Sequence, residues 1–550
     1  MKKLSIQDLN ILKDYSRKAN YEEYNSNPVT MFMWNHYYEI YTEIQENYVL
    51  LLVQYPNNIA WLMPLCEEKY LLDALNHMKD YSSEHNFEFI IHGVTDKFKD
   101  LCEKNHFNFI YTFNEDAQDY IYNIEMHRTL VGKKMQKRRN HYNAFMKDYE
   151  GCFGYRNLEK DDLEMILSFM QEWIKDSEYQ EDIEIEIEGI KTLFNYFDEL
   201  ELHGGCLFID DELKGFSIYS ELSENMIQMH VEKTDKNIRG CSVALLKYTL
   251  RNCDSKYLYM NREDDMGLDH LRKAKKDLQP ISKVRKYTAS YGETKIIKAN
   301  DSYLSKIKEL WLDSFDDEDE DSMNFYFNHL YDSNHCYLLV YNDEIISMAQ
   351  VRFMDLMKDN KVINTPLLFG VCTSLKYQKC GYMRKIVDYV LNQYSYDFML
   401  VQAYNWDLYR SFGFSEAYTV KCSHYESKGI YEGYECYDSN HLLSIYNDFI
   451  KDKDGYRIRD IDYYKNYFIP YKSMYYEIYA NEDAYIVVDK EITLVHECCF
   501  RNIESLYKLL NKFNSIDVLC NLDNHYEIRN VLMAKGNFNR NDHLFISEIM

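Results

Sequence analysis

A pair of short apolar runs joined by a polar turn occurs four times along the chain, and this repetition constrains the fold more than any other feature of the sequence. Apolar runs of this length, separated by turn residues, are typical of β-hairpins. Internal repetition of this kind indicates a chain built from similar structural units. The four pairs are YVLLLVQYPNNIAWLMPL (48–65), CLFIDDELKGFSIYSEL (206–222), CYLLVYNDEIISMAQVRF (336–353) and YYEIYANEDAYIVVDKE (475–491).

Each pair is followed, after a variable interval, by a helical segment and a strand that closes the unit. The closing segments are KNHFNFIYTF (104–113), KDLQPISKVRKYTA (276–289), RSFGFSEAYTV (410–420) and AKGNFNRNDHLFISE (534–548). Hairpins that alternate with helices and closing strands predict an α/β fold with mixed α+β sheets. We expect four tandem units, packed in pairs, with boundaries near 128–150, 290–300 and 425–435. No Pro/Gly/Ser-rich linker marks these boundaries, so the units are expected to pack against one another.

Composition narrows the class of partner. The formal net charge of −27 repels phosphate backbones and argues against general nucleic-acid binding. The 14 cysteines are irregularly spaced with no CxxC pair, so we expect neither a zinc site nor a disulfide framework. Free thiols suit a reducing cytoplasm. No apolar stretch approaches the ~20 residues of a membrane span, and the N-terminus lacks a signal peptide's apolar core. We therefore expect a cytoplasmic protein without a metal, in which the acidic run Asp316–Asp321 is a solvated loop or helix start.

The strongest motif lies between residues 367 and 391. Leu367–Thr373 is an apolar run that fits a buried central strand, and Leu375–Tyr382 is a turn that carries Gln378-x-x-Gly381. An amphipathic helix follows, because the apolar positions then recur at helical spacing: Met383, Ile386, Val387, Val390 and Leu391. A strand, a turn with glycine and a helix N-terminus together form an anion site, for which pyrophosphate is a natural ligand.

This segment resembles the GNAT acetyltransferase family. The family's pyrophosphate loop reads Arg/Gln-x-x-Gly-x-Gly/Ala, and Gln378, Gly381 and Met383 occupy its three positions, although Met383 departs from the preference for a small residue. The form "GYM" looks like one branch of bacterial GNATs. The run Asn405–Phe414 is similar to the closing element of the family, and 307–320 is similar to its first helix. The resemblance covers about residues 296–425.

The resemblance implies direct acyl transfer from acetyl-CoA, or another acyl-CoA, to an amine. The backbone of Val371, Cys372 and Thr373 would hold the pantetheine arm, and Tyr409 would protonate the leaving thiolate. The remaining cofactor-binding residues would be Gln378, Lys379, Cys380, Gly381, Tyr382, Met383 and Asn405. The alternatives are an ordinary strand–helix turn and a tyrosine that only packs the core. No general base is visible, and Cys372 is not expected to act as a nucleophile, because buried cysteines are usually inert.

Two basic segments interrupt the acidic N-terminal half, at 119–145 and 260–287. They could bind a phosphorylated ligand such as CoA or the 3′ end of a tRNA, or form a solvated face that pairs with the many carboxylates. Three stretches of this half, 132–145, His230–Lys233 and Asn261–Pro280, resemble the phosphatidylglycerol lysyltransferase C-terminal-like domain in order. This resemblance covers about residues 20–290 and implies two GNAT-like units.

Members of that family that act on lipids transfer an amino acid from aminoacyl-tRNA to phosphatidylglycerol. They carry a membrane-embedded part, and no segment of this chain resembles it. A possible second site in this half comprises Glu232, Lys233, Asn261, Arg262, Glu263, Lys134 and Arg138. The alternative for these residues is an internal salt-bridge network. The stretch Asn237-x-x-Gly240-x-Ser242 matches a phosphate loop only poorly.

The last unit carries a hairpin but no Gln/Arg-x-x-Gly-x-Gly/Ala loop, so we expect it to shape the acceptor pocket of its neighbour. Paired units of this kind resemble aminoglycoside-modifying acetyltransferases whose C-terminal carboxylate serves as the base, a role that Met550 could fill. The expected domains are 1–290, split near 128–150, then 291–428 for the GNAT domain and 429–550 for the accessory unit.

Three functions are compatible with the sequence. The first is an enzyme of the N-acetyltransferase class (EC 2.3.1) that acylates a small-molecule or peptide amine. The second is an aminoacyl-tRNA-dependent or lipid-directed aminoacyl transferase in the N-terminal half. The third is a non-catalytic protein that binds acyl-CoA.

Overall fold

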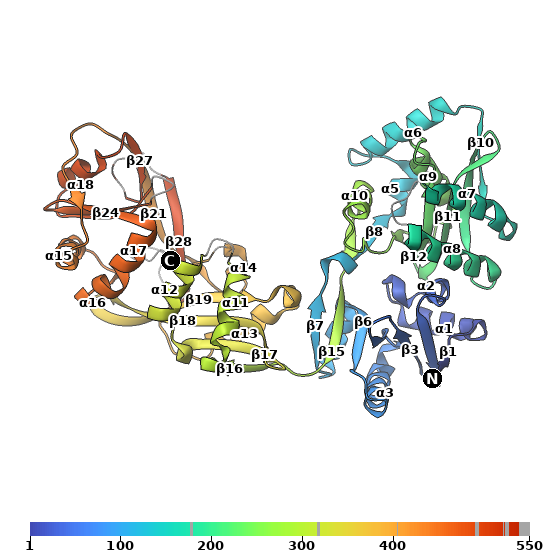
Figure 1. Cartoon of the computed structure of the whole chain (residues 1–550), viewed down its shortest axis with the longest axis horizontal. Helices are drawn as coiled ribbons and strands as arrows, with labels where there is room; N and C mark the ends of the chain where they lie inside the picture. Colours follow the sequence, from blue (N-terminus) through green and yellow to red (C-terminus); the bar gives the residue numbers. More distant parts are fainter. Residues whose placement is uncertain are drawn as a thin grey trace. The chain divides into compact units, whose positions relative to one another are not determined.

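The computed structural model describes residues 1–175, 180–315, 319–403, 405–489, 494–520, 522 and 527–537. The chain forms two compact halves, the N-terminal half Met1–Glu293 and the C-terminal half Thr294–Met550 (Figure 1). Three expectations fall wholly or partly outside the described residues: the acidic run at 316–318, the end of the last closing segment from 538 onward, and the carboxylate of Met550.

The first sheet of the N-terminal half has the order β1-β2-β3-β4-β6-β15-β7, with β5 against β3. Its strands are β1 (Lys2–Lys3), β2 (Glu39–Ile44), β3 (Tyr48–Gln54), β4 (Ile59–Trp61), β5 (Leu65–Cys66), β6 (Ile90–Thr95), β7 (Phe109–Phe113) and β15 (Lys286–Tyr291). The helices of this part of the chain are α1 (Leu9–Ala19), α2 (Pro28–Trp34), α3 (Leu71–Glu84) and α4 (Asp96–Lys104).

The second sheet has the order β14-β8-β13-β12-β11-β10-β9. Its strands are β8 (Asp119–Asn123), β9 (Phe153–Asn157), β10 (His203–Ile209), β11 (Glu212–Ser223), β12 (Met226–Thr234), β13 (Tyr259–Asn261) and β14 (Ser282–Val284). The helices are α5 (Ile124–Thr129), α6 (Gln136–Asp148), α7 (Leu163–Lys175), α8 (Gln180–Asn195), α9 (Cys241–Asn252) and α10 (Asp269–Asp277). One hydrophobic core joins the two sheets, since Val29 of α2 and Ile190 of α8 lie in the same cluster as Val49 and Phe216.

The C-terminal half contains one long sheet in the order β16-β17-β18-β19-β20-β28-β21-β27-β26-β25-β24-β22, with β23 against β18. Its first strands are β16 (Lys295–Lys298), β17 (Cys336–Tyr341), β18 (Glu344–Lys358), β19 (Lys361–Thr373), β20 (Phe398–Val401) and β21 (Ser415–Glu426). The later strands are β22 (Tyr434–Glu435), β23 (Tyr456–Arg457), β24 (Tyr476–Ala480), β25 (Ala484–Asp489), β26 (Leu494–Phe500), β27 (Ser515–Val518) and β28 (Glu527–Gly536). The helices are α11 (Leu304–Leu312), α12 (Glu320–His329), α13 (Tyr382–Leu391), α14 (Trp406–Arg410), α15 (Ser439–Ile450), α16 (Ile461–Tyr463), α17 (Ile469–Tyr475) and α18 (Ile503–Leu510).

The mixed α/β fold is confirmed, and all four expected hairpins form, as β3–β4, β10–β11, β17–β18 and β24–β25. Each hairpin region leads to one parallel pair of strands joined through a helix: β4 with β6, β12 with β13, β19 with β20, and β26 with β27. Parallel neighbours need such a crossover connection. The count of four units stays a prediction, which these four parallel pairs support.

Strands are exchanged between neighbouring sheets. β15 lies between β6 and β7 of the first sheet, although it follows the second sheet in sequence, and β8 lies between β13 and β14 of the second. The expected closing segment 276–289 is therefore shared, with β14 in one sheet and β15 beginning in the other. In the C-terminal half β28 enters between β20 and β21, and β21 continues on to β27. The exchange explains why no linker separates the expected units near 128–150 and 425–435.

Candidate functional sites

The parallel strands β19 and β20 separate soon after they meet. They pair only at Leu367↔Leu400 and Leu368↔Val401, whereas β19 continues to Thr373. The other edge of β19 pairs with β18 as far as Thr373, with an irregularity between Met348 and Gln350. In the described part of the chain no strand pairs with the free edge of β19 beyond Leu368. The half-buried Val371 and Thr373 thus lie where an extended ligand can bind between diverging strands.

The turn after β19 ends at Gly381, which caps α13. Gly381 has φ 94°, a left-handed conformation that favours glycine, and no side chain caps the helix. The first backbone bond of the helix runs from Lys385 N to Gly381 O (3.2 Å), so the preceding amides of α13 have no partner within the helix. A Cβ at Gly381 would meet no atom within 4 Å. The geometry is that of an open anion site at a helix N-terminus.

Three side chains of the loop make contacts within the protein. Gln378 Nε2 donates to Thr373 O (3.2 Å) and so ties the turn to the end of β19. Cys380 and Tyr382 are buried, and the Tyr382 ring packs edge-on against Tyr377. Lys379 is exposed with φ 62°. Burial and hydrogen bonding thus engage Gln378, Cys380 and Tyr382 within the protein, which leaves the backbone amides and the exposed Lys379 accessible.

Tyr409 lies on α14, buried, with Phe412 and Phe414 beside its ring. Burial, together with the nearby thiol of Cys372, raises the pKa of Tyr409 to about 12. Burial also raises the pKa of Cys372 to about 12, so this thiol carries its proton at neutral pH and is a poor nucleophile. Asn405, expected to bind cofactor, caps α14 by accepting from Leu408 N (3.4 Å) and so fixes the helix that carries Tyr409.

The possible second site separates into groups. Arg262 Nη1 binds Glu232 Oε2 at 3.0 Å, and Arg138 lies close enough for the Glu232 charge to act on it. Glu263 accepts from Gln228 Nε2 (2.8 Å), and Asn261 Nδ2 donates to Asp119 Oδ2 (2.9 Å). Two of the predicted residues lie apart, since Lys233 pairs with Glu186 (2.7 Å) and Lys134 is exposed. Most of this set forms the internal network that was the alternative.

Sequence reasoning missed the centre of that network. Lys286 of β15 and Asp119 of β8 are buried and paired at 2.5 Å, and Asp264 lies 3.6 Å from the same ammonium. Burial raises the pKa of the neighbouring Glu23 to about 7, with a contribution from the charge of Asp119 and against the opposing charge of Lys286. The only sequence signal for the pair is one charged residue at the start of each of the strands β8 and β15. The strand exchange that brings these residues together cannot be predicted from the neighbouring sequence.

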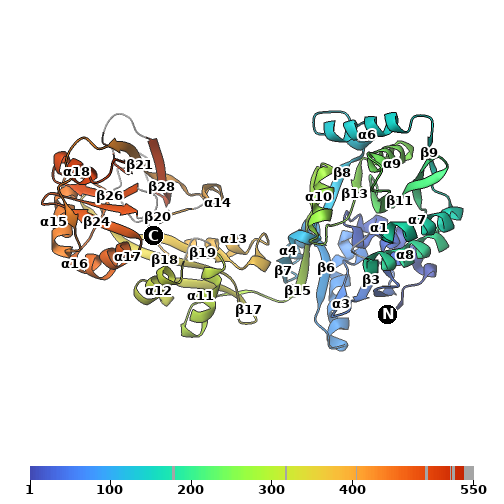
Figure 2. The ribbon, with the colours of Figure 1, turned by 45° about the horizontal axis from the view of Figure 1, so that its top comes forward.

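The second sheet holds a counterpart of the open loop that is closed. Gly240 caps α9 with φ 82°, as Gly381 caps α13. However, a Cβ at Gly240 would lie 2.3 Å from the His141 carbonyl oxygen, because α6 covers this end of α9 (Figure 2). Phe145 of α6 packs in one cluster with Cys241 and Leu245 of α9. α6 therefore crowds the N-terminus of α9 on the side where the Cβ of residue 240 would lie, unlike the open cap at Gly381.

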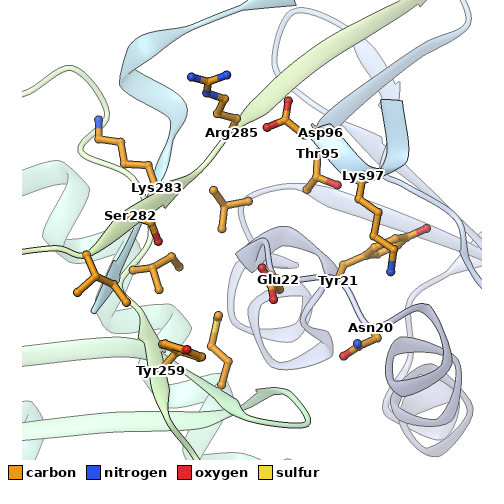
Figure 3. Close-up of a pocket in the computed structure, with 14 residues that line it drawn as sticks. Asn20, Tyr21, Glu22, Thr95, Asp96, Lys97, Tyr259, Ser282, Lys283 and Arg285 are labelled. Carbon is orange, nitrogen blue, oxygen red and sulfur yellow. The ribbon is translucent and has the colours of Figure 1, made fainter. Parts of the chain in front are cut away.

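A cavity of about 590 Å³ lies elsewhere in the N-terminal half (Figure 3). Thr95 and Lys97, at the end of β6 and the start of α4, line one side, and Tyr259 and Ser282 line the other. It owes its existence to the strand exchange, which brings β14 beside β8 and β15 beside β6. Because it includes none of the residues Gln378–Met383, it is a separate feature from the open loop.

Neither a membrane-spanning helix nor a metal-binding cluster occurs among the residues that the structure describes. None of the helices there combines the length and apolar character that crossing a bilayer requires. Over the same residues, no three His, Cys, Asp or Glu side chains are grouped so as to hold a metal ion.

Comparisons with known proteins match both sequence resemblances. Residues 18–290 match the family model described as "Phosphatidylglycerol lysyltransferase, C-terminal", and residues 295–417 match the model "Acetyltransferase (GNAT) domain". An uncharacterised protein of Mycoplasmoides gallisepticum is 28% identical over 174 residues, which are 32% of this chain and 56% of that protein. The chain thus matches little more than half the length of this curated relative.

Solved structures show likeness of fold. A protein of unknown function from Bacteroides thetaiotaomicron is 24% identical with a TM-score of 0.50, over 53% of this chain and 99% of that chain. L-PGS from Bacillus licheniformis is 14% identical with a TM-score of 0.40, over 53% of this chain and 93% of that chain. The likeness to the Bacteroides protein concerns the fold alone.

Proposed function

Because this chain joins a phosphatidylglycerol lysyltransferase C-terminal domain (residues 18–290) to a GNAT acetyltransferase domain (residues 295–417), we propose that it transfers an acetyl or other acyl group from acyl-CoA to an amine. Both domains belong to families of acyl or aminoacyl transfer, which gives the general class of reaction. The finer proposal is an N-acetyltransferase whose site is Val371–Met383 with Tyr409, acting on a small-molecule or peptide amine in the cytoplasm.

The observation that carries this proposal is the open N-terminus of α13. A pyrophosphate needs several free amides, a favourable helix dipole and space at the capping residue. The start of α13 offers the free amides and the dipole. It also offers space, since no described residue beyond the chain neighbours of Gly381 has an atom within 4 Å of the position of a Cβ. The related cap at Gly240 has the same backbone conformation but no space. This contrast favours one donor site for each chain, in the C-terminal half.

The residues of the chain then divide the work. The amides at the start of α13 bind the pyrophosphate, and the free edge of β19 at Val371–Thr373 orients the pantetheine arm between the diverging strands. The amine nitrogen attacks the thioester carbonyl carbon, the carbon–sulfur bond breaks, and the sulfur takes the phenolic proton of Tyr409. The nitrogen loses one proton to water as the amide forms, and the Tyr409 phenolate regains a proton from water. The phenol of Tyr409 carries its proton at neutral pH, as this role requires, although burial makes it a weaker acid than a free tyrosine.

The test is calorimetric titration of the full chain with acetyl-CoA, for Gly381→Asp against Gly151→Asp. Both glycines have positive φ, and a Cβ at either would meet nothing within 4 Å, so the two substitutions introduce the same charge under matched backbone conditions. We expect one site for each wild-type chain, loss of binding in Gly381→Asp and unchanged affinity in Gly151→Asp. Retained affinity and acetyl transfer in Gly381→Asp would place the donor site elsewhere.

A second candidate, aminoacyl transfer from aminoacyl-tRNA to a lipid or other acceptor, is favoured by the family match of residues 18–290. Its test is transfer of a labelled amino acid from aminoacyl-tRNA by the full chain. Transfer that survives Gly381→Asp would assign this activity to the N-terminal half. Binding of acetyl-CoA with no turnover on polyamines, aminoglycosides or lysine peptides would instead support the non-catalytic alternative.

A further inference from the structure

Arg138 of α6 is half-buried, and its Nε lies within the protein without a partner. None of the described residues forms a hydrogen bond or an ion pair with the other nitrogens of its guanidinium. Burial lowers the pKa of Arg138 to about 10. Because a charge taken out of water is strongly disfavoured unless it is paired, this arrangement calls for a compensating anion.

The surroundings of Arg138 carry an excess of positive charge. Arg262, which follows β13, is the nearest cation, and Glu232 of β12 is already committed to it at 3.0 Å. His127 of α5 is buried beside both arginines; its ring lies near the Leu278 carbonyl, but neither nitrogen makes a hydrogen bond of good geometry. Burial and the two guanidinium charges lower the pKa of His127 to about 3, so the imidazole is neutral. Of the two guanidinium groups, only that of Arg262 forms an ion pair with a carboxylate among the described residues.

Another arginine, which is buried, shows how the same chain satisfies such a charge. Arg459 binds Glu497 through both terminal nitrogens, at 2.8 and 2.9 Å, although its Nε likewise has no partner. Phenol groups of Tyr464 and Tyr485 complete its shell. Arg138 has no such carboxylate. Asp277, whose charge also acts on Arg138, lies 3.2 Å from Lys137 and is exposed.

The position of the pair limits the size of the ligand. Arg138 and Glu232 lie beside the diverging parallel strands β12 and β13, which pair only from Met226↔Tyr259 to Gln228↔Asn261. The pyrophosphate end of this opening is closed, since α6 covers Gly240. A ligand here needs an oxyanion for the guanidinium groups but cannot extend a pyrophosphate onto α9. This crowding disfavours CoA bound with its pyrophosphate on α9.

We propose that Arg138 and Arg262 form a binding site for the oxyanion of a small ligand, a carboxylate or a phosphoryl group, in the second sheet of the N-terminal half. Guanidinium groups bind both kinds of oxyanion through paired hydrogen bonds. This site is separate from the acyl-CoA site and does not rest on it, because its residues and its ligand differ.

The experiment is hydrogen exchange of the full chain, followed in peptides of α6 and α9, during titration with sodium phosphate or sodium acetate at an ionic strength held constant with chloride. We expect saturable protection by at least one of the two anions. The anion that protects at lower concentration identifies the phosphoryl or the carboxylate source. Arg138→Met should weaken the affinity for that anion by about tenfold to a hundredfold, the range for loss of a charged hydrogen bond.

Three variants keep the result decisive. Lys147→Met removes the same charge from an exposed position of α6 and should leave the affinity within about twofold, as expected for a surface charge. Arg138→Lys should bind with intermediate affinity. Glu232→Gln should bind the anion more tightly, because it removes the competing carboxylate. An unpaired charge also predicts that, in chloride alone, Arg138→Met is better protected than the wild type.

Three results would overturn the site. One is the absence of any preference for phosphate or acetate over chloride. Another is an equal loss of affinity in Lys147→Met. The third is a loss of protection in Arg138→Met with chloride alone, which would mean that the guanidinium is paired within the protein.

Discussion

Alanine at Gly240 should damage the fold more than alanine at Gly381, although both glycines cap helices in the same left-handed conformation. That conformation costs a residue with a Cβ about 1–2 kcal/mol at either position. At Gly381 nothing else opposes the new methyl group. At Gly240 the Cβ would lie 2.3 Å from the His141 carbonyl oxygen, where ordinary contact begins at 3.4 Å, so α6 must retreat by about 1 Å.

Overpacking of this kind costs about 1–3 kcal/mol. We therefore expect Gly240→Ala to lose about 2–5 kcal/mol and Gly381→Ala about 1–2 kcal/mol. The assay is hydrogen exchange of the full chain at increasing urea, read in peptides of α9 for the first variant and α13 for the second. Equal losses at the two positions, or unchanged exchange in α6 of Gly240→Ala, would refute the conclusion that α6 closes this helix end.

Three further predictions follow from buried groups. Tyr409→Phe should lower kcat by about 10²–10⁴-fold while calorimetry finds the affinity for acetyl-CoA within about twofold, and an unchanged kcat would make the tyrosine a packing residue. Burial raises the pKa of Glu23 from its ordinary 4.5 to about 7, so the unfolded chain loses this proton first and stability falls as the pH rises between these values. Glu23→Gln should flatten that fall by about 3 kcal/mol in urea unfolding of the N-terminal half at pH 5 and pH 8. Glu497→Gln should cost the C-terminal half about 3–5 kcal/mol, since it leaves Arg459 unpaired, and a loss below about 1 kcal/mol in the same assay would contradict a fully buried pair.

Local patterns carried most of the correct sequence predictions. The hairpins and the strand, turn and helix around Gly381 are set by residues close in sequence, so spacing and turn chemistry are enough to find them. The cofactor-binding role of the loop backbone stays a prediction, although the glycine cap and free amides on which it rests are likewise local features. Asn405 was assigned to the cofactor because it lies in the motif, whereas its side chain caps α14.

Long-range pairing accounts for what the sequence did not predict. β15 pairs with β6 and β7, nearly two hundred residues earlier, and nothing in its own sequence distinguishes these partners from β14 or β8. The ion pair of Lys286 with Asp119 depends on that exchange, because the two residues lie in strands that cross between sheets. Residues of the possible second site were chosen by local charge, and charge alone could not separate the exposed Lys134 from the half-buried Arg138.

The two glycine-capped helices bear on how many donors one chain can bind. The sequence gives Gly240 a weak match and Gly381 a stronger one, yet both adopt the same cap, so the loop conformation alone cannot decide the ligand. What differs is the cover, since α6 supplies a carbonyl oxygen and Phe145 where a phosphate would otherwise lie. To open this end of α9, α6 would have to leave the buried cluster that it shares with Cys241 and Leu245. The free energy lost by exposing that cluster is far larger than the free energy gained from a weak phosphate contact. A titration with acetyl-CoA should therefore saturate at one equivalent, and a second equivalent would mean that α6 moves.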